Sequence, residues 1–233
     1  MMRDPIIAAL DVDTLKEARR IIRRLGDAVH NYKIGSQLFT AAGPDAVRLL
    51  RRHRKNVFLD LKYHDIPSTV ARAVRAACRH RVWMLTLHLQ TQPAMLEEAA
   101  RSAREEARRL GITRPLLMGV TVLTSQDATE RSSLTKTVLS LAGKARVSAL
   151  DGVIASARET PYIKKKFGKR LLVVTPGIRP AGASLDDQKR AVTPFEAAKN
   201  GCDYMVVGRP IVLAKDPAAA VAEIKKEIRK ARR

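Results

Sequence analysis

The feature that most constrains the fold is a regular alternation along the whole chain. Short runs rich in β-branched and apolar residues are each followed by a longer amphipathic run, at about 30 residues per pair. The short runs predict strands, and the longer runs predict helices that connect parallel strands. The eight predicted strands cover residues 6–10, 29–34, 57–61, 84–88, 116–122, 152–155, 171–174 and 204–207.

Helical periodicity supports the runs between the strands. Ala18 and Ile22 fall on one face of the first run, and Val221, Ile224 and Ile228 fall on one face of the last. The pattern predicts an α/β protein with a single (β/α)8 TIM barrel, formed by residues 1–233 as one catalytic domain. A doubly wound open sheet is the alternative. Such a sheet more often carries a GxGxxG turn after its first strand, and this sequence has none.

The charge balance limits the classes of partner. The chain has 44 Lys and Arg against 23 Asp and Glu, a formal net charge of +21. Such a surplus fits a solvated basic surface, a phosphorylated metabolite or a nucleic acid. The basic residues are scattered over helical segments, and aromatic residues, which would stack on bases, make up 4%. We therefore favour a solvated surface over nucleic-acid binding.

The sequence also predicts a cytoplasmic protein. The first residues form no signal peptide, and no run is long and apolar enough to cross a bilayer. Cys78 and Cys202 form no CxxC pair, so we expect buried thiols in a reducing compartment. Because neither an HExxH motif nor a carboxylate-rich loop occurs, we expect no bound metal.

Polar residues at strand ends locate the candidate site, since TIM-barrel sites form at the carboxyl ends of the strands. Asp60 and Lys62 alternate at the end of the third strand, so both should point into the barrel mouth, with Asp65 just beyond. A lysine kept protonated by carboxylates can deliver a proton. The alternative is a salt-bridge network that only stabilises the barrel, which is less common because barrel interiors are mostly apolar.

A second motif predicts a phosphate site. Gly208 and Arg209 follow the eighth strand, where a glycine, a guanidinium and a helix start would suit an anion. After the seventh strand come Thr175, Pro176 and Gly177, and then a flexible stretch at residues 181–184 that could close over a ligand. Together these features predict an enzyme with a small phosphorylated substrate.

These segments resemble the orotidine 5′-phosphate decarboxylases along nearly the whole chain. The resemblance rests on DLKYHDIPSTV at residues 60–70, TPGIRP at 175–180 and DDQKR at 186–190. Further similar segments are ALD at 9–11, YKIG at 32–35, GVTVLTS at 119–125 and VGRP at 207–210. The DxKxxD pattern alone is shared with keto-gulonate-phosphate decarboxylases and hexulose-phosphate synthases. A sister enzyme that acts on a sugar phosphate, usually with Mg²⁺, is therefore the second hypothesis.

The resemblance implies decarboxylation of orotidine monophosphate to UMP and CO₂ without metal or organic cofactor. Asp60 would lie against the substrate carboxylate, and Lys62 would protonate C6 as the carbanion forms. Lys33 would hold the charged network and contact the ribose, and Asp11 would bind a ribose hydroxyl.

The resemblance also implies a homodimer with shared active sites, in which Asp65, Ile66 and Thr69 complete the site of the partner subunit. The remaining substrate-binding residues would be Ser125 at the pyrimidine edge, Gln188 and Arg209 at the phosphate, and Pro176 and Gly208 beside them.

Two segments depart from the family pattern. Residues 89–92 read LQTQ where the family has a small, glycine-bearing stretch, and residues 81–83 read RVW in place of Gly-x-Asp. We assign no role to His88 between them. A nucleic-acid-binding protein remains the third hypothesis, and the polar residues at the strand ends argue against it.

Overall fold

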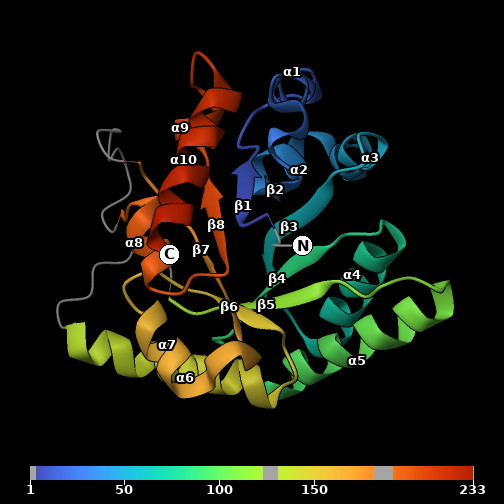
Figure 1. Ribbon diagram of the computed structural model, residues 1–233. Helices are drawn as coiled ribbons and strands as arrows, with labels where there is room; N and C mark the ends of the chain where they lie inside the picture. The colour runs from blue at the N-terminus through green and yellow to red at the C-terminus, as the bar shows by residue number, and fades with distance from the viewer. Residues whose placement is uncertain (1–3, 123–130, 181–190, 233) are drawn as a thin grey trace.

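The structure, a computed structural model, describes residues 4–122, 131–180 and 191–232. Eight parallel strands close into a barrel in sequence order, and β8 pairs with β1 to complete the ring. Figure 1 shows the strands at the centre and the helices around them. The predicted (β/α)8 TIM barrel is confirmed.

All eight predicted strands are present, with bounds that differ from the predicted ones by no more than two residues. Apolar, β-branched runs form them because parallel strands are buried on both faces. The strands are β1 (Ile6–Ala9), β2 (Asn31–Gly35), β3 (Asn56–Tyr63), β4 (Met84–His88), β5 (Leu116–Val120), β6 (Gly152–Ile154), β7 (Leu172–Thr175) and β8 (Tyr204–Val207).

The helices bury the predicted faces against the barrel, including Ala18, Ile22, Val221, Ile224 and Ile228. Capping boxes at Thr14 and Thr193 fix two of the helix starts. The helices are α1 (Leu15–Leu25), α2 (Ser36–Ala42), α3 (Pro44–Arg52), α4 (Pro67–Arg79), α5 (Pro93–Leu110), α6 (Arg131–Val147), α7 (Thr160–Phe167), α8 (Pro194–Lys199), α9 (Arg209–Val212) and α10 (Pro217–Ala231), with short 3₁₀ turns η1 (Gly26–Ala28) and η2 (Gly168–Arg170).

Alternation along the strands divides the apolar side chains into two cores. In β1, Ile6 and Ala8 pack outward against the helices, whereas Ile7 packs inside the barrel. Phe58 of β3 also belongs to the inner core, so Asp60, two residues further on, projects from the same face. The alternation thus directs a carboxylate into the mouth of the barrel.

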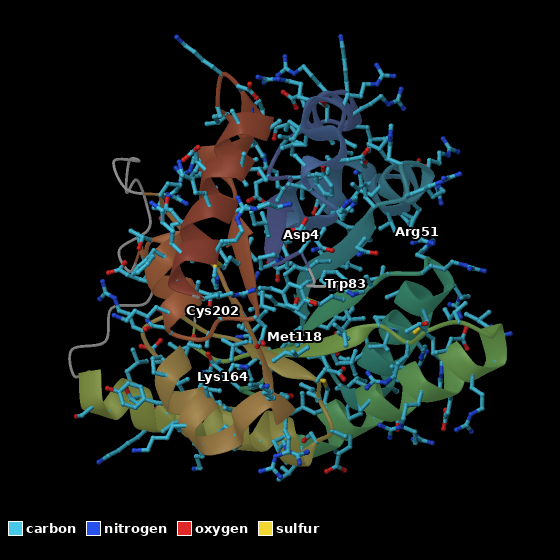
Figure 2. The ribbon with its side chains drawn as sticks, in the orientation of Figure 1. Asp4, Arg51, Trp83, Met118, Lys164 and Cys202 are labelled. Carbon is cyan, nitrogen blue, oxygen red and sulfur yellow. The ribbon has the colours of Figure 1, made fainter. Side chains whose placement is uncertain are left out.

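Many of the basic residues lie on the outer surface. Nitrogen-tipped side chains project from the helices around the barrel, as for Arg51 of α3 (Figure 2). Within the described ranges, no helix combines the length and the apolar character that crossing a membrane would need.

Candidate active site

Two adjoining cavities open at the carboxyl ends of the strands. One has a volume of about 640 Å³ and the other about 160 Å³, and both are lined by Lys33, Asp60, Pro176 and Val206. The smaller cavity is also lined by Lys62. The larger is also lined by Asp11, Gly208 and Arg209. The fold therefore brings together six of the predicted site residues from β1, β2, β3 and β8, together with Pro176 after β7.

Four charged side chains form a row in which acids and bases alternate. Lys33 Nζ lies 2.8 Å from Asp11 Oδ1 and 3.8 Å from Asp60 Oδ2. Lys62 Nζ lies 3.1 Å from Asp60 Oδ1. The side chains of Lys33 and Asp60 are 13% and 14% exposed, so their charges are largely removed from water. Each of these two charges has a partner of opposite sign, as largely buried charges require.

The sequence predicted Lys62 between Asp60 and Asp65, whereas in the structure Lys62 pairs with Asp60, and Lys33 lies between Asp11 and Asp60. Asp65 is exposed, and its carboxylate accepts a hydrogen bond from the backbone N–H of Ile66. Lys62 forms an ion pair with Asp60. Among the described residues, it forms none with Asp65. Asp65 of the same chain therefore lies outside the row of charges.

The end of β3 is not the regular strand on which the alternation argument depended. Its pairing with β4 shifts register between Leu59 and Tyr63, and Lys62 has a positive φ of 51°. A left-handed conformation is uncommon for a residue with a side chain, and it needs support from its surroundings. The irregularity places Lys62 Nζ beside Asp60, so the predicted proximity holds for a different geometric reason.

Thr86 of β4 supplies that support, and sequence reasoning missed it. Its hydroxyl accepts a hydrogen bond from the Lys62 backbone N–H at 2.8 Å and donates one to Asp60 Oδ1 at 3.1 Å. Thr86 is fully buried among apolar neighbours. The signal for it was a lone hydroxyl residue in the strand MLTLH, because a buried polar group needs partners.

Gly35 allows the pair between Lys33 and Asp11 to form. A Cβ at this position would lie 2.9 Å from Lys33 Nζ and 3.2 Å from Asp11 Oδ1. The first distance is shorter than real side chains tolerate, so any larger residue would displace the ammonium.

The larger cavity contains further guanidinium groups that sequence reasoning did not assign. Arg179 lines it together with Arg209, and Arg179 is only 7% exposed. The helix start predicted after Gly208 is present as α9, which begins at Arg209 and has four residues. Arg179 and Arg209 therefore both contribute positive charge to the wall of this cavity, together with Arg20 and Arg24 of α1.

His88 lies next to the charged row without joining it. Its ring stacks on His64 with centroids 5.1 Å apart, and its Nδ1 accepts a hydrogen bond from the Gln90 N–H. Burial, and then the nearby charges of His64 and Lys62, lower the pKa of His88 below its ordinary value. His88 is therefore a neutral ring at neutral pH.

The atypical segment after His88 is built into the core. Leu89 is fully buried, and it fills the space that the missing side chain of Gly119 leaves. Lys144 of α6 donates hydrogen bonds to the carbonyl oxygens of Leu89 and Thr91. A large residue here is thus accommodated beside a glycine on the next strand.

Several predicted features lie outside the described residues. These are Ser125, Gln188 and the flexible stretch at residues 181–184. In the part of the chain that the structure describes, no three His, Cys, Asp or Glu side chains gather as metal ligands would.

The arrangement can bind an anion and hold an ammonium close by. A ligand with a phosphate at Arg209 and Arg179 would extend toward Lys33, Asp60 and Lys62. Little water would surround the charges inside, so electrostatic interactions there would be stronger than at the surface.

Comparisons with known proteins show the family of this chain. A profile of the Orotidine 5′-phosphate decarboxylase / HUMPS family matches residues 4–224. The orotidine 5′-phosphate decarboxylase of Pelobacter propionicus is 47% identical over 232 residues, which cover 97% of this chain and 95% of that protein. The one of Moorella thermoacetica is 45% identical over 234 residues, with 97% and 92% covered.

A solved structure extends the similarity to three dimensions. The crystal structure of orotidine 5′-phosphate decarboxylase from Lactobacillus acidophilus has a TM-score of 0.83 and 37% sequence identity to this chain. The matched region covers 96% of this chain and 98% of the Lactobacillus acidophilus chain. With its barrel, its row of alternating charges and these relatives, the chain belongs to the orotidine 5′-phosphate decarboxylase / HUMPS family.

Proposed function

We propose that this chain is an orotidine 5′-phosphate decarboxylase, a carbon–carbon lyase that produces UMP and CO₂ in pyrimidine biosynthesis. The observation that carries the proposal is the position of Asp60. Its carboxylate lies between the ammonium groups of Lys33 and Lys62, in a cavity that also contains Arg209. Relatives named for this activity match 97% of the chain.

Electrostatics account for the chemical step. Loss of CO₂ leaves an electron pair on C6 of the pyrimidine ring, and the Lys62 ammonium stabilises that charge as it forms. Lys62 then transfers a proton to C6, which gives the C–H bond of UMP. Asp60 would face the substrate carboxylate before it leaves, and it holds Lys62 in position throughout. The positive charge comes from the protein, so the reaction requires no metal or organic cofactor.

Substrate binding is assigned to the rest of the cavity. Asp11 and Lys33 would bind the ribose, and Arg209 would bind the phosphate with Gln188, beside Gly208 and Pro176. Ser125 would bind the pyrimidine edge. Phosphate binding far from C6 contributes energy that can be used to position the ring.

We also propose a homodimer with shared active sites. Ile66 is 63% exposed, and Asp65 and Thr69 beside it are also exposed. A large exposed apolar residue next to an active-site strand suits burial against a second subunit. We expect the enzyme to work in the cytoplasm, where nucleotide synthesis takes place.

The dimer is tested by Ile66→Asp, which would bury a charge at the interface. We expect sedimentation velocity to show a shift from dimer to monomer at micromolar concentration, with a parallel loss of kcat. Tyr162→Asp, which alters another exposed apolar residue on α7, is the control. A variant that stays dimeric would contradict the assignment of Ile66 to the interface.

The activity is tested by following the loss of orotate-ring absorbance with purified protein. We expect turnover to be insensitive to EDTA, and Lys62→Ala to lower kcat by at least about 100-fold with unchanged circular dichroism. Lys226→Ala, on the exposed face of α10, is the matched lysine control. If the parent chain leaves orotidine monophosphate intact but converts a sugar phosphate with Mg²⁺, the sister-enzyme hypothesis replaces this one.

A further inference from the structure

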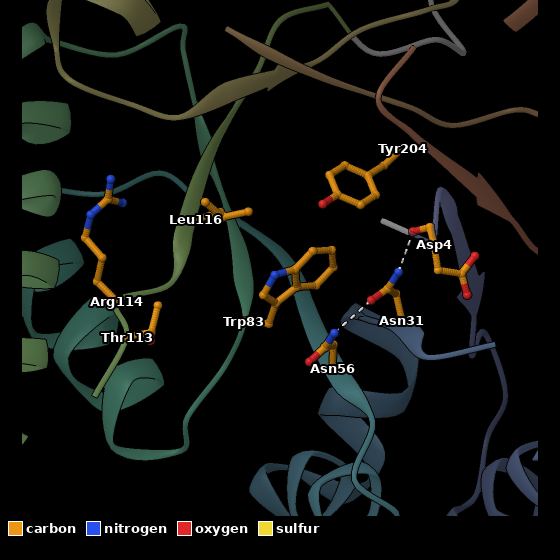
Figure 3. Close-up of a pocket in the computed structure, with 8 residues that line it drawn as sticks. All are labelled: Asp4, Asn31, Asn56, Trp83, Thr113, Arg114, Leu116 and Tyr204. Carbon is orange, nitrogen blue, oxygen red and sulfur yellow. Dashed lines mark hydrogen bonds between the residues drawn. The ribbon is translucent and has the colours of Figure 1, made fainter. Parts of the chain in front are cut away.

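A third cavity opens at the opposite end of the barrel, where the strands begin. Its volume is about 390 Å³, within the range of small-molecule sites. Figure 3 shows the side chains that line it, which come from the starts of β2, β3, β5 and β8 and from the segments just before β1, β4 and β5. The argument rests on Asn31, Asn56, Trp83 and Tyr204.

This cavity is separated from the candidate active site by a layer of apolar side chains inside the barrel. Ile7, Phe58, Met84 and Met118 form that layer, and each is at most 1% exposed. Side chains two residues apart on a strand share a face, so Asn56 lies before Phe58 on the face that ends in Asp60. The two ends of the barrel are therefore separate sites.

Two aromatic rings make a corner in the cavity wall. The rings of Trp83 and Tyr204 have centroids 5.3 Å apart and planes inclined at 76°. Leu116 adds an aliphatic side chain to the same wall (Figure 3). Such a corner can accept a flat ring, stacked on one aromatic face and in edge contact with the other.

The side-chain amides of Asn31 and Asn56 are hydrogen-bonded to each other, and the amide of Asn56 has groups left over for a ligand. Asn31 Nδ2 donates to the carbonyl oxygens of Asp4 and Ile6, and Asn31 Oδ1 accepts from Asn56 Nδ2 at 2.9 Å. Within the described residues, that bond is the only one of the Asn56 side chain. Asn56 thus keeps its Oδ1 acceptor and one N–H donor beside the Trp83 ring.

The two charged residues that line the cavity, Arg114 and Asp4, each form an ion pair with a residue of opposite charge. Arg114 makes two hydrogen bonds of 2.7 Å to the carboxylate of Asp151. Asp4 pairs with Lys225 at 3.3 Å. The cavity at the other end, by contrast, has Arg179 and Arg209 in its wall. A cavity without a net charge, in a chain of net charge +21, favours a neutral ligand over an anion.

We propose that this cavity binds a neutral planar heterocycle of nucleobase size, with adjoining N–H and C=O groups. The ring stacks in the corner of Trp83 and Tyr204. Its N–H donates to Asn56 Oδ1, and its C=O accepts from the Asn56 amide. The site is independent of the decarboxylase assignment, because it shares no lining residue with the active-site cavities.

Trp83 is the only tryptophan of the chain, so its fluorescence reports on this cavity. We expect uracil to quench this fluorescence in a saturable way, and the active site does not contribute because Trp83 lines only the cavity at the opposite end of the barrel. The matched probe 1,3-dimethyluracil keeps the ring but lacks the N–H, and it should bind at least about tenfold more weakly. Equal quenching by both compounds, or none up to the solubility of uracil, would overturn the proposal.

Two variants locate the binding. Asn56→Leu retains the size of the side chain but removes the amide, so uracil affinity should fall about tenfold, to that of the dimethyl compound. Trp83→Phe loses the signal, and isothermal calorimetry then measures whether uracil still binds through the remaining ring and amide. If Asn56→Leu folds poorly, the comparison of the two probes on the parent chain still decides the question. Uracil binding that is unchanged in a folded Asn56→Leu variant would refute the assigned contact.

Discussion

Replacing Thr86 by valine would test whether its buried hydroxyl fixes the charged row. Valine has almost the same shape, so the substitution removes two hydrogen bonds and little packing. The bond to the Asp60 carboxylate contributes about 1.5–3 kcal/mol, and leaving the Lys62 N–H without a partner costs about 1–3 kcal/mol. We expect the free energy of unfolding to fall by about 3 kcal/mol, which for a chain of this size lowers Tm by about 6–12 °C.

The effect on turnover follows from the geometry of Lys62. Its left-handed conformation depends on the bond to Thr86, so valine should let both Lys62 and Asp60 move. A displacement of about 1 Å at a catalytic group can lower a rate by about 100-fold. We expect kcat to fall by about 10- to 100-fold with KM changed much less, measured by orotate absorbance at temperatures well below Tm.

Thr86→Ser is the control, because it keeps the hydroxyl and removes only a methyl group. Serine should retain most of kcat, although it loses some packing. The reasoning is refuted if valine leaves both kcat and Tm unchanged. It is refuted equally if serine and valine impair kcat to the same extent, because the methyl group rather than the hydrogen bonds would then be responsible.

Two further predictions concern the phosphate end and the histidine stack. Arg209→Ala should lower kcat/KM by about 100-fold without changing the circular dichroism, since it removes charge-assisted bonds to phosphate, and normal turnover would remove Arg209 from the site. For His88, the folded-state pKa lies below the ordinary 6.5, so the unfolded chain binds more protons as the pH falls. At a pH above 6.5 His88 is neutral in both states and does not lower the free energy of unfolding. As the pH falls below 6.5, protonation of His88 in the unfolded chain lowers that free energy. Calorimetry between about pH 7.5 and about pH 5 should therefore show a smaller fall in Tm for His88→Gln than for the parent chain, and equal slopes would contradict this.

The sequence was sufficient to predict the barrel and the place of the site. Strand and helix periodicities are local properties of the chain, and closure into a barrel follows from eight repeats of one βα unit. The positions of Lys33, Asp60 and Arg209 could be predicted because each lies near the carboxyl end of a strand, and these ends meet at one rim of the barrel. The structure places all three in the wall of one cavity.

Contacts between strands could be decided only by the tertiary structure. Thr86 and Lys62 are 24 residues apart, and their contact depends on a register shift between β3 and β4 that no local pattern encodes. The buried Arg179 and the cavity around Trp83 are likewise made by residues distant in sequence. The sequence by itself determined which side chains face inward wherever the strands are regular, because alternation along a strand is local. The three-dimensional packing decided which of them meet, because register and distance between strands depend on the whole barrel.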